Sequence, residues 1–258
     1  RFSEDMDFTI QPHMQDEISD QEIFNAFEET FEQISEITGM TFSIPIADIR
    51  PHAATNSMKF NIAYVGPLGG NGNSVKVDAT RGEKLEFEVE FLNVIHDYDD
   101  LEEEGNITIQ CYGLNEVIIE KMVALMGRTV PRDLYDFEYL TSEEGIEMQD
   151  IYGEFKSKAE HKAVTDKHLP EHFVKVVTEK KAKFEKAWDT NLKHQMKELS
   201  NFEEEFEIIL SPKTYNEHLC QIVHQFQRLL RSSALHVLNF SYCSFSSAVT
   251  SNSCALLI

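Results

Sequence analysis

Hydrophobic and polar residues alternate with a period of two along several stretches of the first 113 residues. Successive side chains of a β-strand point to opposite faces, so this pattern predicts strands with one face toward a core. The predicted strands cover residues 2–10, 41–46, 59–66, 74–80, 84–91 and 106–113. The glycine-rich stretch at 67–73 has the composition of a hairpin turn, and the acidic stretch at 96–106 predicts a solvated loop.

One helix is predicted within this strand-rich region. Ser19 and Glu22 form the S-x-x-E pattern of a capping box, in which the two residues satisfy free N–H groups of the first turn. Apolar residues then recur at helical spacing, at Ile23, Phe27, Phe31 and Ile34. Gly39 predicts the end of this helix, because glycine readily adopts the left-handed conformation of a C-terminal cap.

From Asn115 onward the hydrophobic period becomes helical. Asn115 is the predicted N-cap of a helix at 115–128, and Pro131 precedes a second helix at 132–140. Beyond residue 143 the chain is predicted to be mostly helical, with segments at 172–199, 201–210 and 214–233. The pattern predicts an α+β fold, in which a mixed sheet with flanking helices is followed by a helical domain.

We place the domains at residues 1–145 and 146–231. The last residues, 232–258, are rich in Ser, Cys and large hydrophobic residues and carry no charged side chain. This change of composition marks a tail of uncertain origin, to which we assign no function.

The formal charge of −22 is unevenly distributed. Residues 1–150 hold nine Lys/Arg against 32 Asp/Glu, whereas residues 156–197 hold eleven lysines and six acids. Two readings of the lysine-rich stretch remain open, a solvated helix surface or a surface that meets a polyanion such as RNA.

The compartment follows from features that the chain lacks. No stretch approaches the roughly 18 consecutive apolar residues of a membrane span, and the charged start RFSEDMDF is unlike a secretory signal. The four cysteines show no C-x-x-C spacing. We expect a cytoplasmic protein without a membrane partner.

Two acidic patterns on predicted strands could carry chemistry. Asp5 and Asp7 lie two apart and project from one face of a strand, where two carboxylates can hold Mg²⁺. Glu86, Glu88 and Glu90 likewise share one face of 84–91. Each pattern is also compatible with an exposed sheet face, where water screens the like charges.

A third pattern lies on the two predicted helices. Lys121 and Arg128 are seven residues apart and share a helix face, so both cations could meet phosphate. Asp133 and Asp136 share a face of the next helix. A surface array of ion pairs that includes Arg132 is the alternative.

The residues of these segments and their order along the chain resemble those of the AbiEii-type nucleotidyltransferase toxins of type IV toxin–antitoxin and abortive-infection systems. R-F-S-E-D-M-D-F is similar to the family's R-x-S-x-D-[IL]-D-F signature, and E-V-E-F to a later strand that supplies a third acid. E-K-M-V-A-L-M-G-R-T-V-P-R-D-L-Y-D is similar to its E-K-L-x-A-L-x-x-R-x-x-x-R-D-L-Y-D element. The resemblance covers about residues 1 to 210 and implies a nucleotidyltransferase-type sheet.

The resemblance also implies roles for individual residues. The metal-binding acids would be Asp5, Asp7 and Glu88, with Glu86 as the second choice for the third acid. Lys121 would contact the nucleotide phosphates. The remaining matches are Asp133 and Asp136 of the R-D-L-Y-D element, with Ser3, Arg128 and Arg1 in support.

The implied activity is transfer of a nucleoside monophosphate from an NTP to an acceptor, with Mg²⁺ as cofactor and the 3′ end of a tRNA as the expected acceptor. A cognate antitoxin is the expected protein partner. The family's Gly-Gly-Ser/Thr loop is expected just before Arg1, so the chain would be truncated at its N-terminus and catalyse little. The alternatives are an inactive binding module that keeps the fold, and a D-x-D glycosyltransferase, which would leave R-D-L-Y-D unexplained.

Overall fold

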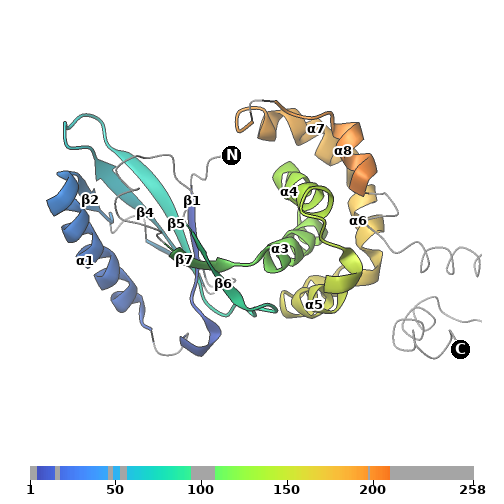
Figure 1. Cartoon of the computed structure of the whole chain (residues 1–258), viewed down its shortest axis with the longest axis horizontal. Coiled ribbons are helices and arrows are strands. Elements are labelled where there is room, and N and C mark those ends of the chain that lie inside the picture. The colour runs from blue at the N-terminus through green and yellow to red at the C-terminus, as the bar shows by residue number, and fades with distance from the viewer. Residues whose placement is uncertain are drawn as a thin grey trace, which may run out of the picture. The chain divides into compact units, whose positions relative to one another are not determined.

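A mixed sheet of five strands dominates the N-terminal part of the fold (Figure 1). The computed structural model describes residues 5–14, 18–45, 49–52, 57–93, 108–196 and 198–209. The strands run in the order β1-β5-β4-β2, with β3 also paired to β4. Their bounds are β1 Asp5–Thr9, β2 Thr41–Ser43, β3 Arg50–His52, β4 Ser57–Val65 and β5 Asn73–Thr80. The alternating pattern predicted all of these strands except β3.

β1 is the parallel strand of this sheet. It pairs with β5 from Asp5 opposite Lys76 to Thr9 opposite Thr80, whereas β2, β3 and β5 all pair with β4 in antiparallel fashion. The antiparallel β4–β5 hairpin is closed by residues 66–72, which confirms the predicted turn. Gly69 and Gly70 adopt positive φ there, a conformation that favours glycine.

Helix α1 (Asp20–Thr38) covers one face of the sheet. Ser19 and Glu22 form both hydrogen bonds of the capping box, and Gly39 ends the helix in the left-handed conformation, as predicted. Phe24 and Phe27 pack against Phe60 with ring centroids 5.3 Å apart. This aromatic contact joins the helix to the core residues of β4 and β5, which are Met58, Phe60, Ile62 and Val77.

Strands β6 (Val89–Asn93) and β7 (Thr108–Tyr112) form a separate antiparallel ribbon. The prediction that a strand starts at residue 84 is wrong, because residues 84–88 form no strand and β6 begins only at Val89. This segment bends at Glu86 and Phe87, and we call it the 84–88 bend. Glu116 holds this bend from the next helix, since its Oε2 accepts hydrogen bonds from the backbone N–H groups of Glu86 and Phe87, each at 2.9 Å.

From Leu114 to Ile209, the described part of the chain is mostly helical, as predicted. Its helices are α3 Leu114–Gly127, α4 Pro131–Ser142, α5 Met148–His161, α6 Phe173–Glu179, α7 Lys181–Leu192 and α8 Phe202–Ile209, with short 3₁₀ turns at Val164–Asp166 and Pro170–His172. A further 3₁₀ turn, Pro12–Met14, lies between β1 and α1. Helix α3 starts one residue before Asn115, so its N-cap is Gly113. The predicted helix at 172–199 is instead two helices on either side of Lys180, and the second ends at Leu192, before the predicted end.

All described residues belong to one unit, residues 1–210. The predicted boundary near residue 145 falls between α4 and α5 and remains a prediction. The predicted loop at 96–106, the predicted helix at 214–233 and the tail at 232–258 lie outside the described residues. None of the described helices is long and apolar enough to cross a membrane.

Candidate active site

The polar face of the sheet lies opposite the face that α1 covers. Residues paired in register on neighbouring strands share a face. The strand pairing therefore aligns three polar rows across β1, β5 and β4, namely Asp5–Lys76–Asn61, Asp7–Asp78–Lys59 and Thr9–Thr80–Ser57. We call these nine residues the polar face.

Asp7 and Asp78 are direct partners in the parallel register of β1 and β5. Neighbouring strands lie about 4.8 Å apart, so the two carboxylates leave the sheet side by side. The ammonium of Lys59 lies 2.5 Å from Oδ2 of Asp78, and the hydroxyl of Thr80 donates a hydrogen bond of 3.5 Å to Oδ1. Lys76 lies 3.4 Å from Asp5 in the adjacent row. The structure thus places two lysines among three acids.

Asp78 is a residue that the sequence analysis missed. The alternation in S-V-K-V-D-A-T puts Asp78 on the polar side of its strand, opposite the buried Val77 and Ala79. That signal was available, but it does not say which strand lies beside β5. Only the β1–β5 pairing makes Asp78 a neighbour of Asp7.

The predicted third acid, Glu88, precedes the β6–β7 ribbon, whereas Asp7 and Asp78 belong to the five-stranded sheet. Glu88 is exposed and lies directly before β6. Glu90 pairs with Cys111, on the opposite side of the ribbon from Tyr112, and its carboxylate crowds Gly113. Glu86 lies 2.9 Å from Lys84. No hydrogen bond or ion pair joins Glu88 to Asp7 in the described part of the chain.

Tyr112 connects the ribbon to β1 just beyond the acids. Its hydroxyl lies 2.5 Å from the hydroxyl of Thr9, and Gln110 accepts a hydrogen bond of 2.7 Å from Gln11. Burial raises the pKa of Tyr112 to about 12, and the nearby carboxylates add to this shift. Tyr112 therefore remains a neutral phenol that fixes the end of β7, and with it the start of α3, against β1.

A buried ionic network fixes α3 against α5. Lys158 is fully buried, and its ammonium lies 2.6 Å from Glu116 and 2.6 Å from Glu120. Glu83 lies 3.5 Å from Lys158 and also pairs with Lys162. Although burial disfavours the ammonium, Glu120 and Glu116 raise the pKa of Lys158, so it remains charged. We call these five residues the Lys158 network.

The second half of the predicted site comes together on α3 and α4. Lys121 lies 2.7 Å from Asp136 and 3.5 Å from Asp133. Arg128 donates two hydrogen bonds to Asp133, at 2.7 and 2.9 Å. Its bonds with Asp133 raise the pKa of Arg128. These four residues form the α3–α4 cluster, in which Asp133 is buried and Lys121 keeps 24% of its side chain exposed.

Lys180 holds the end of α3 that carries this cluster. Its ammonium donates to the backbone carbonyls of Leu125, Met126 and Arg128 at 2.6, 2.8 and 3.1 Å. These carbonyls belong to the last turn of the helix and the residue after it, where partners within the helix are missing. The lysine lies at the junction of α6 and α7, so helix packing positions Arg128.

Six of the predicted site residues therefore lie in two groups, and their roles stay predictions. Asp5 and Asp7 belong to the polar face, whereas Lys121, Arg128, Asp133 and Asp136 form the α3–α4 cluster. In the described residues, no group of three acidic, His or Cys side chains is close enough to hold a metal ion by itself. Ser3 and Arg1 lie outside the described residues.

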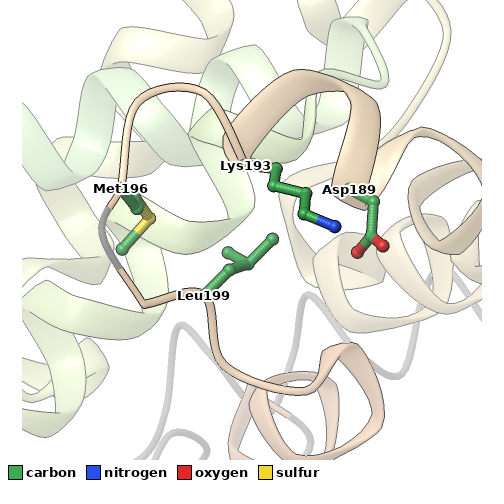
Figure 2. A pocket seen from close by; sticks show the side chains of 4 residues that line it. All are labelled: Asp189, Lys193, Met196 and Leu199. Carbon is green, nitrogen blue, oxygen red and sulfur yellow. The ribbon is translucent and has the colours of Figure 1, made fainter.

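Five of the lysines at 156–197 have partners in the described residues, and one of these, Lys175, forms only an exposed pair with Glu179 at 3.9 Å. The other four are Lys158, Lys162, Lys180 and Lys181, the last of which pairs with Glu203 at 2.5 Å. Lys175 is exposed, as are Lys156, Lys167, Lys183, Lys186 and Lys193. A pocket beside the end of α7 is lined by Asp189, Lys193, Met196 and Leu199 and contains no predicted site residue (Figure 2).

Known proteins are similar to this chain in fold and in family. A search of curated proteins found no relative. The fold is similar to the crystal structure of JHP933 from Helicobacter pylori, with a TM-score of 0.50 and 17% identity over 89% of this chain and 82% of that one. A second Helicobacter pylori protein, proposed to be a nucleotidyltransferase, matches with a TM-score of 0.46 and 17% identity over 89% and 81% of the two chains.

The family comparison covers most of the sequence. The model of the AbiEii nucleotidyl transferase toxin of type IV toxin–antitoxin systems matches residues 1–223. Both polar groups described above, on the sheet and on α3–α4, lie within that range. The chain therefore belongs to the AbiEii nucleotidyl transferase toxin family.

Proposed function

We propose that the protein transfers a nucleoside monophosphate from an NTP to an acceptor hydroxyl, and that the polar face holds the reacting phosphates. The observation that carries this proposal is the register pairing of Asp7 with Asp78, next to Asp5. In the reaction, the acceptor oxygen bonds to the α-phosphorus while the bond to the bridging oxygen breaks. Pyrophosphate leaves with that electron pair, and the acceptor proton passes to solvent.

The acids of the polar face fit a magnesium ion by their chemistry. Mg²⁺ prefers oxygen ligands and is commonly bound by one or two carboxylates, with substrate phosphates and water completing the shell. Asp7 and Asp78 are two such carboxylates on one face, so a complete protein cage is not required. When bound, Mg²⁺ would neutralise phosphate charge. We propose Asp5, Asp7 and Asp78 as its ligands and keep Glu88 as the competing third acid.

The α3–α4 cluster is proposed to bind the nucleotide phosphates through Lys121 and Arg128. Lys121 is partly exposed and held by Asp136, so its ammonium is positioned and remains accessible. Asp133 is buried against Arg128, and we propose that it positions this guanidinium and does not contact substrate itself. Asp136 is likewise proposed to position the ammonium of Lys121.

The proposed acceptor is the 3′ end of a tRNA, and the proposed protein partner is the cognate antitoxin that the family description implies. Support for RNA comes from the exposed lysines of α5–α7, which have no role in the Lys158 network. Such a surface attracts a polyanion and makes its binding dependent on salt. The rest of the described surface offers no comparable run of lysines.

The test is incorporation of label from each α-labelled NTP into total tRNA by the full chain. We expect transfer that D7N and D78N each lower by about a hundredfold or more, because a metal-holding carboxylate contributes several kcal/mol to the transition state. E88Q should retain activity. The reverse result, with E88Q inactive and D78N active, would assign the third acid to Glu88.

A complete absence of labelled product with every NTP would favour the inactive binding module. Circular dichroism of each variant separates a lost site from a lost fold. Asp7 is exposed and has no ionic partner within the described residues, so its replacement should leave the thermal transition unchanged.

A further inference from the structure

Lys59 is the third member of the row that contains Asp7 and Asp78. We propose that Lys59 is a positioning and phosphate-binding residue of this site. Its ammonium neutralises Asp78 while no divalent cation is bound, and turns to the triphosphate once that carboxylate is taken. This inference rests on the proposed function, because it assumes that Asp78 is a metal ligand.

The geometry of the ion pair supports this role. The ammonium of Lys59 lies 2.5 Å from Oδ2 of Asp78, and Thr80 takes the other carboxylate oxygen. The side chains of Lys59 and Asp78 are 36% and 18% exposed, so the pair is reached by solvent. A dissolved cation can therefore reach Asp78, and Lys59 can swing away without crossing the core.

The balance of charge explains why a lysine is needed there. Asp7 and Asp78 stand side by side, and like charges directly opposite each other in a sheet are destabilising. Lys59 offsets this repulsion in the empty site. A divalent cation would compete with Lys59 for Asp78, whereas a bound triphosphate would supply new negative charge for the released ammonium.

Lys76 provides a comparison within the same sheet. It belongs to the neighbouring row and lies 3.4 Å from Asp5, so its contact is longer, and its side chain is 50% exposed. Its own row, Asp5–Lys76–Asn61, contains one carboxylate and no adjacent pair. We therefore expect a weaker effect of Lys76 on a cation held by Asp7 and Asp78.

The proposal predicts opposite effects of one substitution on two ligands. In K59M the cation that competes with the metal is absent, so Mn²⁺ alone should bind about two to five times more tightly, as expected for one exposed ion pair. The same variant should bind non-transferable α,β-methylene triphosphates in saturating Mg²⁺ about two to five times more weakly. K59R keeps a cation and should stay near wild type in both measurements.

Mn²⁺ binding is measured by electron paramagnetic resonance, and triphosphate binding by calorimetry, on the full chain. A purely structural role would weaken both ligands together, and that result would overturn the proposal. Unchanged Mn²⁺ binding in K59M would overturn the role of Lys59 while leaving the metal site in place. If neither the wild type nor K59M binds Mn²⁺ more tightly than D7N, the metal site itself fails, and this inference fails with it.

Discussion

The ammonium of Lys158 lies 2.6 Å from Oε1 of Glu116, and neither side chain is accessible to solvent. The other carboxylate oxygen of Glu116 holds the backbone of the 84–88 bend. One buried ion pair therefore joins α5, α3 and the segment that leads into the β6–β7 ribbon. The position of α3 relative to the ribbon therefore depends on Lys158, which is not one of the predicted site residues.

Replacement of Lys158 by Met should destabilise the fold strongly. Glu116, Glu120 and Glu83 would lose their shared cation, and an unpaired buried charge typically costs about 3–5 kcal/mol. Urea unfolding measures this loss. The matched control is K156M on the same helix, where the exposed lysine should change the stability by less than about 0.5 kcal/mol. Equal stability of the two variants would contradict the network.

Replacement of Lys180 by Met should loosen the end of α3. Three backbone carbonyls would lose their charged donor, at a cost of about 1–3 kcal/mol. Hydrogen exchange should accelerate at the amides of the last α3 turn and of Arg128, with less change at the start of the helix. The neighbouring exposed lysine gives the control K183M, which should leave exchange unaltered. Uniform acceleration along α3 would argue against a local cap.

Replacement of Lys121 by Ala should impair the nucleotide step and leave the fold intact. The ammonium is partly exposed and is the proposed phosphate contact, so kcat/KM for the NTP should fall about tenfold to a hundredfold. K121R should recover part of this loss because it restores the cation. Steady-state kinetics at varied NTP concentration make the measurement. Kinetics of K121A that match the wild type would remove Lys121 from the site.

The pairing of Glu138 on α4 with Glu205 on α8 should make stability depend on pH. Burial raises the pKa of Glu138 to about 7, and the neighbouring Glu205 adds to the shift. The folded state therefore keeps a proton that the unfolded chain releases near pH 4.5. Stability is fully present below about pH 4.5 and declines as the pH rises toward about 7.

Replacement of Glu138 by Gln tests this dependence. The amide cannot ionise, so E138Q should show a flatter profile and exceed the wild type at pH 8 by on the order of 1 kcal/mol, after allowance for screening by solvent. Thermal unfolding between pH 4.5 and 8 provides the profile. Parallel curves for E138Q and the wild type would show that the carboxyl pair does not carry the dependence.

Local patterns in the sequence determined much of the fold. Capping by Ser19 and Glu22, termination at Gly39 and the turn at 67–73 depend on hydrogen bonds and backbone preferences within a few residues. The period of the apolar residues distinguished the strand-rich half from the helical half, because this period also follows from the local backbone geometry. The R-D-L-Y-D element brought Lys121, Arg128, Asp133 and Asp136 into view, because one short turn joins the two helices that carry them.

Tertiary structure alone decided which acids are neighbours. Asp7 and Asp78 are 71 positions apart in the chain and meet through a parallel pairing whose register no local pattern encodes. The even spacing of Glu86, Glu88 and Glu90 suggested a strand. In the structure, Glu116 on α3 accepts a hydrogen bond from the backbone of Glu86, and Lys158 on α5 donates to the carbonyl of Lys84, and these contacts hold the segment in another conformation. Such contacts form only when distant segments pack, since a buried charge selects its partner by proximity in the folded chain.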